Sequence, residues 1–163
     1  MKLSENIYSI RRNKISNVIR NGEMCIIFSG RPVRLSRDQN YDFIVNKNFF
    51  YLTGIENENL ILFMKKVNGE MKSTLFIENR EKSKIKWIGE TILKDEALNI
   101  SSVEEVRYLN EFDSFLNSLF LNEETPTVYF DFDRDDYNHE ISYSENFATQ
   151  LRIKYPNLIL KNI

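Results

Sequence analysis

Apolar residues near the amino terminus follow a helical spacing, and the next apolar residues form a continuous block. Between residues 4 and 21, the apolar positions make one helical stripe and the basic positions take mainly the other face, before Asn21 and Gly22 end the helix. The apolar positions are Ile7, Ile10, Ile15, Val18 and Ile19, and the basic ones are Arg11, Arg12, Lys14 and Arg20. Residues 24–28 are all apolar, which predicts a buried strand covered on both faces.

The next part of the chain alternates a polar stretch with short apolar runs. Residues 34–47 are mostly polar and predict an ordered loop, and residues 49–53 have the aromatic and β-branched composition of a strand. Residues 60–64 and 74–77 predict two more strands. The Asn68-Gly69 pair between them favours a tight hairpin turn, so these two strands should pair in antiparallel fashion.

Helical and strand patterns also alternate in the second half. The pattern predicts a polar helix over residues 82–98 with an interruption at Gly89, a short strand at 106–109, an amphipathic helix from 112 to about 122, a final strand at 127–130 and a last helix at 142–154. Strands alternating with helices, plus one hairpin, indicate an α/β fold with a mixed β-sheet flanked by helices. With 163 residues, three Pro and five Gly, the chain shows no flexible linker, and we expect one domain over residues 1–163.

Charge and composition exclude several classes of partner. The 22 basic and 24 acidic residues are interspersed and leave a net charge of −2, so we expect no nucleic-acid partner. No apolar run approaches the ~20 residues that span a bilayer, and we expect no membrane partner. The single Cys25 lies in an apolar run and is interpreted as a small buried side chain in a reducing compartment, with the cytoplasm as the expected location.

The sequence contains no complete set of catalytic or metal-binding residues. His139 is the only histidine, which excludes a histidine-based triad or a multi-histidine zinc site within the chain. Glycine-rich phosphate loops and the nucleophile elbow are also absent. We therefore predict no catalytic residue, no metal ligand and no cofactor in this chain.

One acidic run after the strand at 127–130 allows two interpretations. Asp131 and Asp133 lie where a magnesium-dependent phosphatase places its nucleophile and metal ligand. Little chain remains to supply the lysine and the second carboxylate pair that such an enzyme needs. A solvated acidic loop before the last helix is the other interpretation.

The most specific feature is an ordered set of residues in the first half. It consists of Tyr41, Phe43, Asn46 and Phe49, followed by Tyr51-Leu52-Thr53-Gly54, then an apolar strand, a hairpin ending in Leu75-Phe76, Arg80 and Lys86-Trp87-Ile88-Gly89. In this order the set resembles the amino-terminal domain of Xaa-Pro aminopeptidases, which prolidase and creatinase relatives share. The resemblance extends from about residue 7 to residue 158. The Tyr-Leu-Thr-Gly element favours the aminopeptidase branch over a dipeptidase.

Two positions depart from the family pattern. Ile44 stands where relatives often carry arginine, and Arg80-Glu81 replaces a common Arg-Asp pair. Both changes leave the expected fold intact and weaken the transfer of detailed function from those loops.

The resemblance implies a ribonuclease-H-like layout and a non-catalytic role. In this family a carboxyl-terminal domain, which we expect to be absent from this chain, carries a dinuclear and usually manganese centre that hydrolyses the bond before proline. We therefore expect the chain alone not to be an enzyme, and its partners to be its own catalytic domain, further copies in a homo-oligomer and proline-containing peptides. The domain would shape the substrate cleft and make oligomer contacts.

The resemblance also directs attention to two side chains. Trp87 lies in a polar, lysine-rich segment that lacks the apolar neighbours an indole ring normally packs against. It is therefore the candidate to reach the substrate cleft of a neighbouring subunit. Arg80 is a second candidate, able to pair with a carboxylate there. Packing under a loop for Trp87 and a surface ion pair for Arg80 are the alternatives. For the chain as a whole, the alternatives are a free-standing binding or oligomerisation module, or a phosphatase using Asp131 and Asp133.

Overall fold

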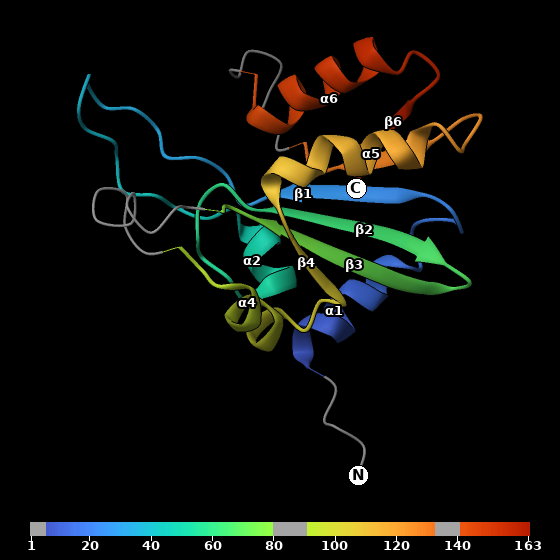
Figure 1. Cartoon of the computed structure of the whole chain (residues 1–163), viewed down its shortest axis with the longest axis horizontal. Helices are drawn as coiled ribbons and strands as arrows, with labels where there is room; N and C mark the ends of the chain where they lie inside the picture. The colour runs from blue at the N-terminus through green and yellow to red at the C-terminus, as the bar shows by residue number, and fades with distance from the viewer. Residues whose placement is uncertain (1–5, 80–90, 133–140) are drawn as a thin grey trace.

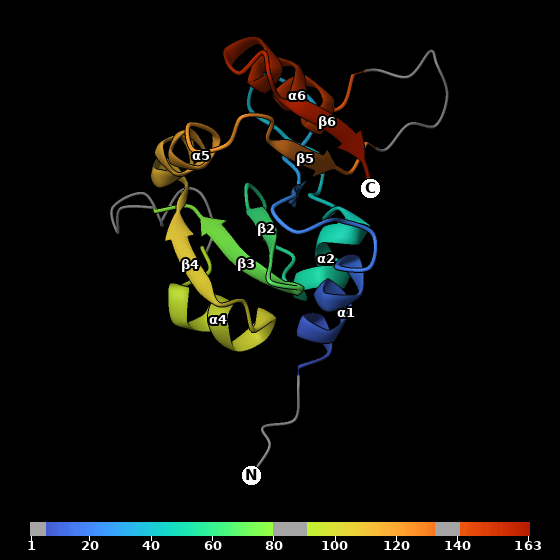
Figure 2. The same ribbon diagram turned by 90° about the vertical axis from the view of Figure 1, so that its right-hand side faces the viewer.

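The computed structural model describes residues 6–79, 91–132 and 141–163. These residues form three layers, in which helices cover both faces of one β-sheet (Figures 1 and 2). The strands are β1 (Met24–Phe28), β2 (Ile61–Val67), β3 (Glu70–Ile77), β4 (Glu105–Tyr108), β5 (Thr127–Phe130) and β6 (Ile159–Asn162). The helices are α1 (Ile7–Ile15), α2 (Lys47–Thr53), α4 (Lys94–Ser101), α5 (Phe112–Phe120) and α6 (Tyr143–Lys154), with a 3-10 turn at Leu109–Glu111. No helix among these is both long and apolar enough to cross a bilayer.

The six-stranded sheet has the order β4-β3-β2-β1-β5-β6 and is mixed, as predicted. The strands from β1 to β3 pair in antiparallel fashion, while β4, β5 and β6 each join a parallel neighbour. The predicted hairpin between β2 and β3 is confirmed. Its turn residues Asn68 and Gly69 both have positive φ, 52° and 86°, as a type I′ turn requires.

The core has two halves, one on each face of the sheet. Successive residues of β1 point to opposite faces, and all five are buried, which confirms the predicted doubly covered strand. Mainly aliphatic side chains, together with Phe49 and Tyr129, fill the side of α1, α2 and α4. The side of α5 and α6 is rich in stacked and edge-to-face phenylalanines, which include Phe28, Phe63, Phe76, Phe112, Phe115, Phe130 and Phe147.

The predicted strand at 49–53 is wrong, because these residues form α2. The side chain of Asn46 accepts a hydrogen bond from the Phe49 N–H at 2.9 Å, which caps the start of the helix. Gly54 ends it at φ 72°, and its N–H donates to the Phe50 carbonyl at 2.8 Å. These two caps outweigh the β propensity of the aromatic residues between them.

Two more elements differ from the sequence prediction. The strand at 127–130 is not the last, since β6 follows α6 at the sheet edge. β6 is short, and most of it is exposed, so it lacks the apolar run that marks a buried strand. Within the described residues, the helix predicted over 82–98 is present only as α4, because residues 91–93 are not helical and Leu93 is extended, with φ −85° and ψ 156°. Residues 80–90 lie outside the described ranges.

The first helix is shorter than predicted and its faces are partly exchanged. α1 ends at Ile15, and Ile7, Ile10 and Val18 of the predicted apolar stripe are exposed. Arg12, assigned to the solvent face, is instead 2% exposed and donates to main-chain carbonyls of α2 and the end of α4. Sequence spacing identified the helix but not the side that would face these polar groups.

Candidate functional site at the carboxyl ends of β1 and β5

Two small adjoining cavities open where the parallel strands β1 and β5 end. One measures about 170 Å³ and the other about 90 Å³. Both are lined by Phe28 and Gly30 at the end of β1 and by Tyr143 at the start of α6. Carboxyl ends of parallel strands are a common place for ligands and functional loops, so this edge is the candidate site.

Asp131 holds three elements together at this edge. One oxygen of its carboxylate accepts hydrogen bonds from the side-chain amides of Asn46 at 3.2 Å and Asn48 at 2.9 Å. Its main-chain carbonyl accepts from the Ser144 hydroxyl at 2.9 Å. Asp131 therefore ties the start of α2 and the start of α6 to the end of β5. Sequence analysis singled out Asp131 and Asn46 but did not pair them, because they are 85 positions apart.

The same edge anchors the loop of residues 31–45, which stands away from the body of the domain (Figure 1). At one end, the Asn59 N–H donates to the Gly30 carbonyl; at the other, the Asn46 N–H donates to the Ser29 carbonyl, both at 2.9 Å. Arg31 lies 4.2 Å from the centre of the Tyr143 ring and donates to its hydroxyl at 2.9 Å. The loop thus has a fixed base.

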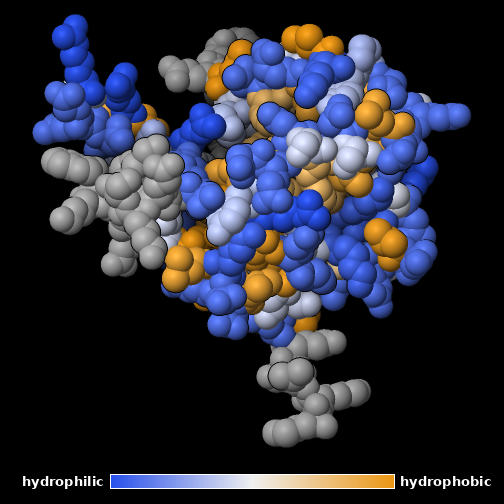
Figure 3. Space-filling model, viewed as in Figure 1, coloured by the Kyte–Doolittle hydropathy of each residue, from blue (hydrophilic) through white to orange (hydrophobic). Residues whose placement is uncertain are grey.

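Beyond this base the loop is largely exposed, including its apolar side chains. Residues 33–42 are all exposed, which agrees with the predicted loop at 34–47 as far as α2. Its exposed large apolar side chains are Val33, Leu35, Tyr41 and Ile44, the last 84% exposed. In Figure 3 the loop projects from the body of the domain and is mostly hydrophilic, with apolar side chains between polar ones. Four exposed apolar side chains on one projecting, anchored loop make it a candidate surface for contact with another protein.

The described part of this edge can position groups but offers no catalytic pair. Histidine is absent from residues 6–79, 91–132 and 141–163, and no three His, Cys, Asp or Glu side chains in those ranges gather to hold a metal ion. Asp131 accepts from neutral amides, which fits a structural role. Asp133 and His139, and the cleft candidates Arg80 and Trp87, lie outside the described residues.

Cys25 lies in β1, beside Tyr129 of β5, and is fully buried, as predicted. Burial raises the pKa of its thiol, and the negative charge of Asp131 raises it further. The thiolate, which is the reactive form, is therefore suppressed at neutral pH.

We expect Cys25 not to react with a thiol reagent in the folded protein. Its reaction with dithionitrobenzoate should proceed at the rate of global unfolding and become immediate in denaturant, because both access and ionisation require the core to open. Fast labelling of the native protein, with the circular dichroism spectrum unchanged, would contradict this expectation.

Comparison with known proteins assigns the fold to a family. The model of the aminopeptidase P, N-terminal domain, matches residues 8–129. Human Xaa-Pro aminopeptidase 3 is 27% identical over 169 residues, which cover 96% of this chain and 33% of that protein. A Bacillus anthracis structure classed as an aminopeptidase P superposes with a TM-score of 0.89 at 30% identity, covering 96% of this chain and 37% of the other.

The fold is also that of a zinc-substituted Escherichia coli aminopeptidase P in complex with product. The TM-score is 0.75 at 19% identity, over 99% of this chain and 37% of the other. The chain thus spans about a third of the length of the relatives it matches. The resemblance drawn from the ordered residues between Tyr41 and Gly89 is confirmed, and the chain belongs to the family of aminopeptidase P amino-terminal domains.

Proposed function

We propose that this chain is the non-catalytic amino-terminal domain of a proline-specific metalloaminopeptidase that removes the first residue from Xaa-Pro peptides. The family match over residues 8–129 and the alignment with the first part of much longer relatives support this role. In such an enzyme the rest of the polypeptide forms the catalytic domain. A dinuclear manganese centre there would activate water and polarise the peptide carbonyl.

The contribution of this domain is to wall the substrate cleft and to make contacts within an oligomer. The single observation that carries this proposal is the anchored 31–45 loop, which presents Leu35, Tyr41 and Ile44 to the outside. Burying apolar side chains of this size against a neighbouring domain contributes about 1.5–3 kcal/mol each. We retain Trp87 and Arg80 as further candidates to reach a cleft, that of a neighbouring subunit.

The test is a chimera in which residues 1–163 replace the matching domain of the Bacillus anthracis relative. We expect the chimera to cleave an Xaa-Pro tripeptide in the presence of manganese. In it, Tyr41→Ser and Ile44→Ser together should lower kcat/KM by about tenfold, because loss of the loop contacts misplaces the cleft wall.

The matched control is Leu121→Ser, which removes an apolar side chain that is 74% exposed at the end of α5 remote from the loop (Figure 1). It should leave kcat/KM unchanged. An equal loss in both variants, or a chimera that folds and binds manganese without any cleavage, would argue against the cleft role.

The mass of the native protein distinguishes this proposal from a free-standing binding module. An antibody raised against the domain should detect a species far heavier than 19.4 kDa in its source cell. A species at 19.4 kDa would favour the module instead.

No observation in the described residues favours the phosphatase alternative, since the Asp131 carboxylate already joins Asn46 and Asn48.

A further inference from the structure

The outer edge of β6 presents main-chain groups that the sheet does not use. The N–H groups of Ile159 and Ile163 donate inward, to the Pro126 and Phe130 carbonyls of the β5 side, at 2.9 and 3.0 Å. In a parallel ladder these bonds alternate along the strand, so the N–H and C=O of Leu160 and Asn162 point to the open side. β6 ends the strand order, and among the described residues no strand pairs with that side.

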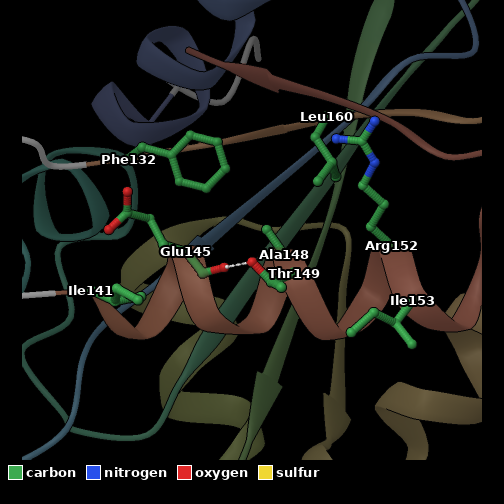
Figure 4. A pocket seen from close by; sticks show the side chains of 8 residues that line it. All are labelled: Phe132, Ile141, Glu145, Ala148, Thr149, Arg152, Ile153 and Leu160. Atoms are coloured by element: carbon green, nitrogen blue, oxygen red, sulfur yellow. Dashed lines mark hydrogen bonds between the residues drawn. The ribbon is translucent and has the colours of Figure 1, made fainter.

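A groove of about 560 Å³ lies beside this edge, between β6 and α6, with a mainly apolar lining that also includes Glu145 and Arg152, one charge of each sign (Figure 4). Phe132 and Leu160 face Ala148 of α6 across it (Figure 4). Two isoleucines at its rim are unusually exposed, Ile141 at 77% and Ile153 at 69%. Such side chains gain most from a partner that covers them.

A second groove, of about 310 Å³, lies on the opposite face of the sheet, between the α1–α2 layer and the end of the chain. It has an apolar lining that includes Ile15, Leu52 and Ile163, and it carries two cations, Arg11 and Lys14. Another cation, Lys161, projects from β6 toward this face, where its ammonium group lies near the Tyr129 hydroxyl and the Glu23 carboxylate, at 3.4 and 3.5 Å. The two sides of the edge therefore differ. The groove beside α6 is mainly apolar with one charge of each sign, whereas the groove beside α1 combines an apolar lining with cations only.

We propose that the open edge of β6 binds an extended segment of a partner protein as a seventh strand, with apolar residues at alternate positions and acidic residues between them. Side chains of an added strand point alternately to the two faces of the sheet. The apolar ones would enter the groove below α6, and the acidic ones would lie opposite Lys161 and near Lys14. Main-chain bonds to Leu160 and Asn162 would hold the strand in register.

Charge disfavours a second copy of this chain as the occupant. An antiparallel β6 pair that uses the outward groups of both Leu160 and Asn162 in each copy places Lys161 directly opposite Lys161 of the other. Like charges at directly opposite positions destabilise a strand pair, whereas an acidic residue there stabilises it. This is one way in which natural edge strands avoid pairing with themselves.

The test uses a capped, fluorescent seven-residue peptide of alternating valine and glutamate, compared with an alternating valine and lysine peptide. Binding to the 163-residue chain is measured by anisotropy, and hydrogen exchange by NMR. The glutamate peptide should slow exchange at Leu160 and Asn162 by about tenfold. It should leave the amides of Ile159 and Ile163 unchanged, because the sheet already bonds them. A glutamate peptide with N-methylated alternate amides should not bind.

Variants of the chain separate the contributions. Lys161→Glu should reverse the preference, so that the lysine peptide binds about fivefold more tightly than the glutamate peptide. Lys161→Gln should make the affinities of the two peptides equal. Ile153→Ser should weaken both peptides by about tenfold through the groove. Leu93→Ser, which removes an apolar side chain of similar exposure, 70%, just before α4 and outside both grooves, is the matched control and should change nothing.

Three outcomes would overturn the proposal. One is unchanged exchange at Leu160 and Asn162 at saturating peptide. Another is equal affinity of the two peptides in every Lys161 variant. The third is protection of the same amides without peptide as the chain concentration rises, which would make the occupant a second copy.

Discussion

Replacing Gly54 by alanine is expected to lower the free energy of unfolding by roughly 2–4 kcal/mol, as measured by urea denaturation. Gly54 has a φ of 72°, which a residue with a Cβ adopts only at a cost. In addition, an added Cβ would overlap the ring of Tyr8, which packs against the end of α2. Because Tyr8 is half-buried on the first turn of α1, the overlap is relieved only if its ring or the helix itself moves away from the end of α2.

Gly22→Ala is the matched control for this prediction. Gly22 has a φ of 88° but nothing within 4 Å of the added Cβ, so only the backbone term, about 1–2 kcal/mol, should appear. The difference between the two variants then measures the clash with Tyr8. Adding Tyr8→Ala to Gly54→Ala should restore part of the loss, and equal losses at both glycines would contradict the role of Tyr8.

Replacing Arg12 by methionine is expected to lower the free energy of unfolding by roughly 3–5 kcal/mol. The guanidinium donates to the carbonyls of Leu52 at 2.8 Å, Ser101 at 2.7 Å and Ser102 at 2.7 Å. Methionine fills a similar volume but leaves these carbonyls without a donor in a buried place. Burial lowers the pKa of Arg12 to about 10, while the negative charge of Glu104 acts to raise it. The side chain therefore remains a cation at neutral pH.

Arg11→Met is the control next to it on the same helix. Arg11 is only partly buried; it lies 4.2 Å from the Tyr51 ring centre and donates to the Tyr51 carbonyl at 3.0 Å. Its loss should lower the free energy of unfolding by less than about 1 kcal/mol. Arg12→Lys should fall between the two, because a compact ammonium group lacks the planar fork that reaches several carbonyls at once. A small effect of Arg12→Met in thermal and urea unfolding would show that water replaces the guanidinium.

The candidate site was predictable in its parts but not in its arrangement. The sequence pointed to Asp131 after a strand and to Asn46 within a family pattern. The pairing of Asp131 with Asn46 and Asn48 depends on β1 and β5 being parallel neighbours, which brings the ends of distant segments together. The grooves beside β6 were also beyond sequence analysis, because β6 itself lacks the pattern of a buried strand.

Local patterns alone determined the buried central strand Met24–Phe28, the hairpin turn at Asn68 and Gly69, and the helix Phe112–Phe120. In each case the deciding forces, hydrophobic periodicity and turn geometry, act between residues close in the chain. The helix at residues 49–53 was also decided locally, by the caps at Asn46 and Gly54, which outweigh the β propensity of the aromatic residues between them. Only the tertiary structure decided that Arg12 is buried. That outcome depends on carbonyl groups of α2 and α4 that surround Arg12 when the three helices pack together, and no spacing within one segment reveals contacts with another.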